Sequence, residues 1–126
     1  MSVNLKSNIK HFSAIFFVSN RKKVMDYYSK LGFWCDYEMG FVERDGLMLI
    51  FHESENPKSI IPNSPLHGKE ALHIFAMVEG IDGLYEEFMS KGAVFHYTLK
   101  TNQYKMREFA IIDPQGYTIG FGEFLD

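Results

Sequence analysis

Hydrophobic residues along the chain switch between short unbroken runs and helical spacing. Phe12 to Val18 is an apolar run without Gly or Pro, which is typical of a buried strand. After Asn20, a residue suited to capping a helix, apolar residues recur at three- and four-residue steps up to Leu31. Gly32 follows, and glycine favours the end of a helix. The pattern therefore predicts a strand followed by an amphipathic helix.

Three strands are predicted next, from Phe33 to Tyr37, Phe41 to Arg44 and Leu47 to His52. Asp45 and Gly46 separate two of these apolar runs, and Asp-Gly at such a place is a strong hairpin signal because both residues accept a positive φ. The stretch from Ser54 to Gly68 is rich in Pro, Asn and Ser and is expected to be a linker.

The same order of elements then recurs. A strand is predicted over Ala71 to Val78 and a helix over Ile81 to Lys91. The three strands that follow are predicted at Ala93 to Tyr97, Met106 to Ile112 and Tyr117 to Phe124. The chain is thus predicted to hold two copies of a strand-helix-three-strand unit, an α+β arrangement of two sheets about a pseudo-twofold axis.

Individual positions support the duplication. One constant offset relates Val18, Val24 and Tyr28 in the first half to Val78, Leu84 and Phe88 in the second. A second constant offset relates Gly46, Phe51 and Glu53 to Gly116, Phe121 and Glu123. Matched turn glycines and strand ends favour duplication over chance similarity.

Length and composition narrow the class of protein. The 126 residues suit one domain with its own core. A net charge of −3 argues against a nucleic-acid partner, which requires a basic surface. Cys35 is the single cysteine, so an internal disulfide framework is excluded. We expect a cytoplasmic protein with no membrane partner, because no apolar run is long enough to span a bilayer and the first ten residues lack a signal core.

Two segments resemble a known family. They are Tyr27-Tyr28-Ser29-Lys30-Leu31-Gly32-Phe33 and Arg107-Glu108-Phe109-Ala110-Ile111-Ile112-Asp113-Pro114-Gln115-Gly116-Tyr117. Together with the duplication they resemble the vicinal oxygen chelate superfamily of glyoxalases, bleomycin resistance proteins and extradiol dioxygenases. The resemblance implies two βαβββ modules in tandem, forming an open, cupped eight-stranded barrel with helices outside, commonly as a homodimer. On that basis residues 1–126 form one domain, with modules at 10–53 and 70–126 and a linker at 54–69.

The resemblance also implies where metal-dependent members hold their ion. Four matched strand positions carry His or Glu in those members, and here they fall on Ser13, Ile50, His73 and Gly120. Only His73 could bind a metal strongly, whereas even open catalytic sites keep about three protein ligands. We therefore predict no metal site, no cofactor and no catalytic residue.

Alternation along the strands predicts what faces the cup. Phe17 shares a face with Ser13, Phe75 with His73, and His52 with Ile50. Arg107 is a candidate residue for binding an anionic ligand, or for forming a salt bridge with Glu108 or Glu53 at the rim of the cup. The predicted ligand-binding set is Ser13, Phe17, Ile50, His52, His73, Phe75, Tyr104, Arg107 and Gly120. The alternative is that the cup-facing side chains fill the barrel as core.

Three functions fit these residues. The first is a metal-free protein that sequesters a small molecule in an apolar cup or dimer groove, as the resemblance to bleomycin resistance proteins implies; Arg44 to Phe51 looks like that subgroup. The second is a glyoxalase-like lyase, isomerase or dioxygenase acting on a small oxygenated metabolite with a divalent metal. The third is an interaction module with a plugged cup. Three non-ligating positions out of four argue against an enzyme.

Overall fold

The computed structural model describes residues 6–126. The first half forms a four-stranded sheet in the order β1-β4-β3-β2, with β1 parallel to β4 and the other pairs antiparallel. Its elements are β1 (Ala14–Val18), α1 (Arg21–Lys30), β2 (Trp34–Asp36), β3 (Phe41–Arg44) and β4 (Leu47–Glu53). Asn20 accepts a hydrogen bond from the backbone N–H of Lys23 and so caps α1 as expected.

The second half repeats this arrangement in the order β5-β8-β7-β6. Its elements are β5 (Ile74–Met77), α3 (Ile81–Ser90), β6 (Phe95–Thr101), β7 (Met106–Ile112) and β8 (Thr118–Phe124). Strand registers bear out both sequence offsets: Phe16 pairs with Phe51 in one half, as Ala76 pairs with Phe121 in the other. Between the halves the linker forms a 3₁₀ turn (Pro57–Ser59) and the short α2 (Ser64–His67).

Several strands differ from their predicted bounds, most of all β1, β5 and β6; β5 begins at Ile74, whereas its predicted start is Ala71. β1 begins at Ala14, and Phe12 before it is 84% exposed, because the strand pairing with β4 does not extend to it. β6 continues to Thr101, beyond the predicted Tyr97. Its pairing with β7 shifts register twice, so the alternation that sequence reading relies on is broken there.

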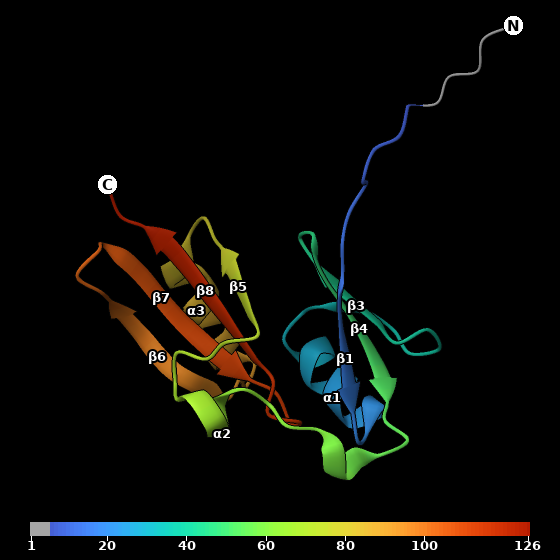
Figure 1. Ribbon diagram of the computed structural model, residues 1–126. Coiled ribbons are helices and arrows are strands. Elements are labelled where there is room, and N and C mark those ends of the chain that lie inside the picture. The colour runs from blue at the N-terminus through green and yellow to red at the C-terminus, as the bar shows by residue number, and fades with distance from the viewer. Residues whose placement is uncertain (1–5) are drawn as a thin grey trace, which may run out of the picture.

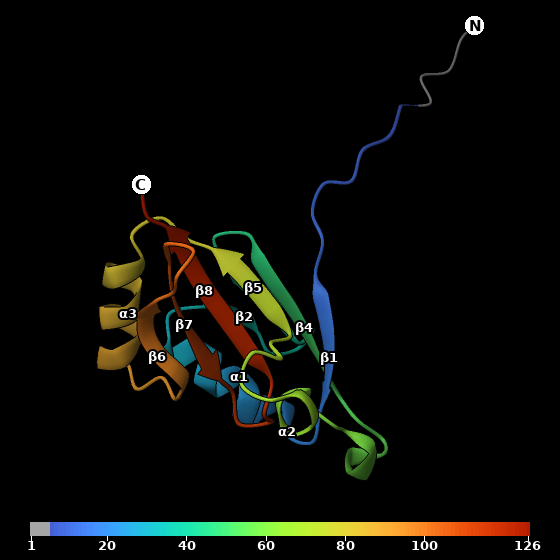
Figure 2. The ribbon, with the colours of Figure 1, turned by 60° about the vertical axis from the view of Figure 1, so that its left-hand side comes forward.

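The two sheets lie side by side with the edge strands β1 and β5 toward each other, and α1 and α3 cover the same side of the strands (Figures 1 and 2). The predicted fold is confirmed: two tandem βαβββ modules with helices outside. The eight strands do not close into a complete barrel, because β1 and β5 belong to separate hydrogen-bonded sheets.

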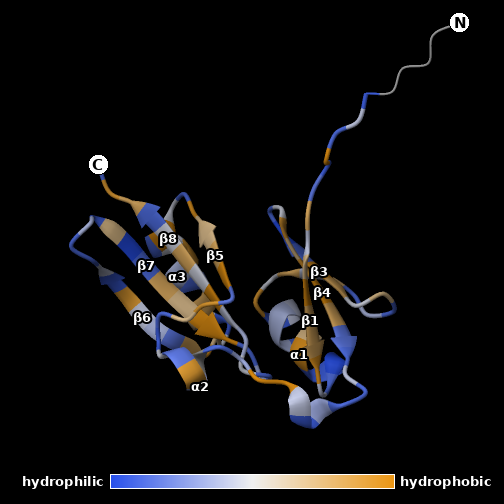
Figure 3. Cartoon of the chain, viewed as in Figure 1, coloured by the Kyte–Doolittle hydropathy of each residue, from blue (hydrophilic) through white to orange (hydrophobic). Residues whose placement is uncertain are grey.

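One hydrophobic core lies between the strands and the two helices. Alternate strand residues, among them Val18, Leu49 and Phe51, face the helices and are buried. The Phe33 and Phe88 rings meet 6.3 Å apart and join the cores of the two halves. Figure 3 shows the hydrophobic residues along β1, β5 and β8.

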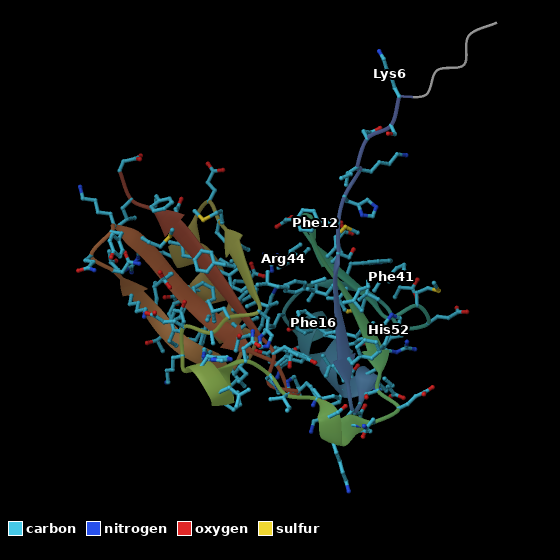
Figure 4. The ribbon with its side chains drawn as sticks, viewed as in Figure 1. Lys6, Phe12, Phe16, Phe41, Arg44 and His52 are labelled. Atoms are coloured by element: carbon cyan, nitrogen blue, oxygen red, sulfur yellow. The ribbon has the colours of Figure 1, made fainter. Side chains whose placement is uncertain are left out.

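Polar contacts also join the halves. The Tyr28 hydroxyl donates to Asp113 Oδ2 over 2.9 Å in a buried hydrogen bond. Arg44 donates to both carboxylate oxygens of Glu87, at 2.6 and 2.9 Å, and its guanidinium carbon lies 5.4 Å from the centre of the Phe88 ring. Figure 4 shows Arg44 reaching from the first half toward the second. The halves therefore form one packed body.

Candidate functional site

The strand face that points away from the helices is open and partly apolar. We call this surface the open face. On the facing edge strands β1 and β5, Ile15 is 57% exposed, Phe17 53%, Phe75 42% and Met77 58%. Monomeric soluble proteins rarely expose neighbouring large apolar side chains without a ligand or partner for them. These four side chains are thus partly exposed on the open face.

In the first half, two of the predicted site residues line one small cavity. Ser13 and Ile50 lie together around a space of about 120 Å³ that Trp34, Phe41 and Met48 also border. The aromatic walls come from β2 and β3, whose outward-facing residues the sequence alone did not mark as site residues. Alternation along β3, with Val42 buried, is the signal that would have found Phe41.

Phe17 and His52 lie at the neighbouring end of the same face. Their rings are 5.6 Å apart at 37°, and they border a broad depression of about 570 Å³. Glu53 and Glu55 also line that depression. Figure 4 labels His52 near the end of β4.

In the second half, the Phe75 ring lies directly on the backbone of β8. A Cβ atom built on Gly120 would come within 2.7 Å of Phe75 Cδ2, and one on Gly122 within 2.6 Å of Phe75 Cζ. Both glycines are buried although they face away from the helices. The two glycines thus form a platform for the ring, and the ring covers the position where the resemblance implies a metal ligand.

His73 is engaged within the chain. Its Nε2 accepts the backbone N–H of Asn63 over 3.1 Å, and its Nδ1 lies 3.0 Å from the hydroxyl of Thr118. Nδ1 also lies 3.0 Å from the backbone N–H of Thr118, so both nitrogens of the neutral imidazole are engaged within the chain. Burial, and secondarily the nearby His96, lowers the pKa of His73, which favours this neutral form.

The structure does not bring Tyr104 and Arg107 to these residues. Tyr104 is 73% exposed in the turn between β6 and β7. Arg107 points toward α3, where its Nη2 lies 2.8 Å from Asp82 Oδ1. The salt bridge considered from sequence therefore forms with Asp82 instead of Glu108 or Glu53.

A polar cluster on the open face of the second half was missed. The Tyr97 hydroxyl donates to Glu108 over 2.6 Å, and Asn102 donates to the other Glu108 oxygen over 3.0 Å. Lys100 Nζ lies 4.3 Å from the centre of the Tyr97 ring. Burial, followed by Glu108, raises the pKa of Tyr97, so the phenol stays a donor. The register shifts in β6 hid this cluster from sequence reading.

Metal-ligating side chains are not gathered in the part of the chain that the structure describes. Within residues 6–126, no three or more His, Cys, Asp or Glu side chains lie close enough to share an ion. Over the same residues, no helix is both long and apolar enough to cross a bilayer.

Comparisons with known proteins agree with the fold. Residues 8–121 match the family model described as the glyoxalase/bleomycin resistance protein/dioxygenase superfamily. A glyoxalase/bleomycin resistance protein/dioxygenase from Alicyclobacillus acidocaldarius superimposes with a TM-score of 0.71 at 20% identity, covering 93% of this chain and 92% of that one. TioX from Micromonospora sp. ML1 gives 0.67 at 14% identity, covering 92% and 99%. UcmS2 gives 0.67 at 15%, covering 92% and 98%. No curated protein sequence matches significantly.

Proposed function

The chain belongs to the glyoxalase/bleomycin resistance protein/dioxygenase superfamily, and we propose that within it this protein binds a small apolar molecule on its open face without a metal ion. The observation that carries the proposal is the Phe75 ring lying on Gly120 and Gly122. An aromatic side chain here takes the space in which metal-dependent relatives are expected to place a ligand.

The other matched positions support the same proposal. Ile50 has no donor atom, and the hydroxyl of Ser13 is a weak ligand for a transition metal. His73 uses both ring nitrogens for Asn63 and Thr118. A bound ion would have to break those hydrogen bonds and would still lack the three protein ligands of an open catalytic site.

The chemistry of the open face indicates the class of ligand. Its exposed side chains are largely apolar or aromatic, with Glu108 and Lys100 as charged points near one side. Small-molecule sites usually combine an apolar lining with a few polar groups. We propose a mainly aromatic or apolar ligand, and a second copy of the chain as the cover that turns the open face into a groove.

A ligand screen with matched variants tests the proposal. Thermal unfolding of the full chain is followed across a panel of aromatic antibiotics and small apolar metabolites. A ligand present at about 100 times its dissociation constant adds roughly 2.7 kcal/mol to stability. For a hit, Ile15→Ala on the open face should weaken binding about tenfold, because it removes apolar contact area. Ile61→Ala in the linker, an equally exposed isoleucine, should not.

Elemental analysis tests the metal-free part separately. Protein purified without chelators should hold no stoichiometric nickel, zinc, iron or manganese. A tightly held ion that is lost in His73→Ala would overturn this part of the proposal and favour the lyase, isomerase or dioxygenase alternative.

A further inference from the structure

A second cavity lies between the two halves, on the helix side of the strands. It measures about 420 Å³, a size typical of small-molecule sites. Its walls come from the turn between β3 and β4 and from the stretch that runs from β5 into α3. None of the nine predicted site residues lines it. Its apolar wall includes Phe33, Leu47, Ala76, Leu84, Phe88 and Phe121.

The internal repeat shows what a filled version of this cavity looks like. Because the chain is duplicated, the turn between β7 and β8 meets β1 as the turn between β3 and β4 meets β5. At that matched junction the Tyr117 ring packs 4.5 Å from the Phe16 ring, and its hydroxyl donates to the Phe17 carbonyl over 2.7 Å. Gln115 accepts hydrogen bonds from the backbone N–H and the hydroxyl of Ser19, at 2.7 and 3.0 Å, and closes the mouth.

The open junction carries different residues at the matched places. Leu47 stands where the other half has Tyr117, so an aromatic ring is missing. Asp45 and Glu79 stand where the other half has Gln115 and Ser19. Two carboxylates cannot bond to each other as that pair does. The cavity is therefore an unfilled copy of a place that a phenol ring fills elsewhere in the same molecule.

Charge at the mouth favours a cation. Arg44, the basic residue of the lining, is already held by both oxygens of Glu87 and by the Leu31 carbonyl. Asp45 is exposed, and the cation nearest to it among residues 6–126 is Arg44, whose Nε lies at a long 3.7 Å. Glu79 forms no ion pair or side-chain hydrogen bond with any residue between 6 and 126. Two carboxylates are thus left at the edge of an apolar cavity.

We propose that this inter-half cavity binds a small aromatic amine, with its ring against the phenylalanine wall and its ammonium group between Asp45 and Glu79. Aromatic rings gain from offset or edge contacts with one another, and an ammonium group forms strong hydrogen bonds with carboxylates. This site is separate from the open face and goes beyond the function proposed above.

Titration calorimetry of the full chain with three compounds of one shape tests the proposal. The probes are 2-phenylethylamine, neutral 2-phenylethanol and anionic 3-phenylpropionate. The amine should bind at least tenfold more tightly than the alcohol, and the acid should bind least. In the double variant Asp45→Asn with Glu79→Gln, the advantage of the amine over the alcohol should disappear.

A second test of the proposal uses substitutions that fill the cavity. Gly83 lines it on α3, and a Cβ atom there would meet nothing within 4 Å. Gly83→Ala should therefore keep amine binding, whereas Gly83→Trp should abolish it. Leu47→Tyr, which copies Tyr117, should abolish it too and serves if the tryptophan variant fails to fold.

The residues that respond to the amine distinguish binding in this cavity from binding on the open face. Backbone amide shifts in the nuclear magnetic resonance spectrum should change at 44–47 and 76–84 when the amine is added. Changes centred instead on Ile15 and Phe75, equal affinities for the three probes, or binding that survives Leu47→Tyr would overturn the proposal. Ile15→Ala should leave amine binding unchanged, so failure here is distinct from failure of the open-face proposal.

Discussion

At the scale of single residues, Asp113 is a buried carboxylate on which the turn before β8 depends. It is 5% exposed, and its Oδ1 accepts the backbone N–H groups of Gln115, Gly116 and Tyr117 at 2.9, 3.0 and 3.1 Å. Its Oδ2 accepts the Tyr28 hydroxyl. Burial raises the pKa of Asp113 and, first among its causes, that of Tyr28. One carboxylate thus shapes the turn before β8 and ties it to α1.

Replacing this carboxylate by an amide should be costly. Asp113→Asn offers one acceptor oxygen instead of two, so the Tyr28 hydroxyl can no longer donate to it while that oxygen accepts the turn N–H groups. We expect a loss of about 2–3 kcal/mol in the free energy of unfolding, measured with urea. Tyr28→Phe removes a single hydrogen bond and should lose less, about 1–2 kcal/mol. Equal effects of the two variants would contradict this account.

Sequence reading reached the turn but not its partner. The sequence marks Gly116 as a turn glycine matched in both halves, and the apolar spacing after Asn20 predicts a helix face on which Tyr28 is 1% exposed. The hydrogen bond between Tyr28 and Asp113 was not predicted, because the two residues are 85 positions apart and nothing local links them. His73 stays a predicted ligand-binding residue; the contact of its ring with the linker backbone at Asn63 was not predicted, because composition does not encode how the linker folds back.

At the scale of elements, the repeat preserves a helix cap. Glu123, at the end of β8, accepts the backbone N–H groups of Gly80 and Ile81 at the start of α3, over 3.2 and 3.1 Å. Glu53, its match at the end of β4, accepts the Arg21 N–H at the start of α1 over 3.2 Å. Carboxylates at helix N-termini satisfy free N–H groups and the positive end of the helix dipole.

The two caps should contribute different amounts to the free energy of unfolding. The first residue of α3 is preceded by Gly80, which has no side chain to cap the helix, whereas α1 already has Asn20. We expect Glu123→Ala to lower the free energy of unfolding by about 1–2 kcal/mol and Glu53→Ala by less than about 1 kcal/mol. Thermal unfolding of the two variants measures the difference. A larger effect at Glu53 would show that the α1 cap is not redundant.

Elements with regular spacing were predicted well, and irregular ones were not. Both helices and the hairpin strands follow from apolar periodicity and from Gly and Asp-Gly signals, which are local. The ends of β1 and β6 differ from the prediction because a strand begins and ends where its pairing with a neighbouring strand does, and the local sequence does not show that pairing. Phe12 is as apolar as the strand residues that follow it, yet the pairing of β1 with β4 begins only at Ala14.

At the scale of the whole molecule, Arg44 and Glu87 join the two halves. The hydrogen bonds from Arg44, and next those from Lys91, lower the pKa of Glu87 to about 2 from an ordinary 4.5. A lowered carboxylate pKa gives stability that is present above the unfolded-state pKa and is lost as pH falls through the folded-state pKa. The junction of the halves should therefore weaken between about pH 4.5 and 2.

Removing the charge should remove that pH dependence. Glu87→Gln should cost about 1 kcal/mol at pH 7, a modest value because the pair is partly exposed and screened by water. The gap between the two proteins should narrow as pH falls from 5 to 2, measured by urea unfolding at each pH. A gap of constant size would show that the ionised form of Glu87 has no special role.

The exposed strand face also leads to an expectation about assembly. We expect a homodimer that covers the open face, because four large apolar side chains there are more than two-fifths exposed. Phe17→Glu should raise the dimer dissociation constant at least tenfold, whereas Met89→Glu on the outside of α3 should not. Sedimentation velocity across a concentration series measures both. Dissociation unaffected by Phe17→Glu would place any interface elsewhere.

The Phe75 ring on Gly120 and Gly122 has a consequence for how this chain can change over generations. A glutamate or histidine introduced at Gly120 would collide with the ring and with Leu72, whose Cδ1 would lie 2.5 Å from the new Cβ. A side chain at Gly120 would require both Phe75 and Leu72 to shift or to be replaced by smaller residues, steps that by themselves bring no ligand. The order in which substitutions at positions 75 and 120 can be accepted is thereby constrained.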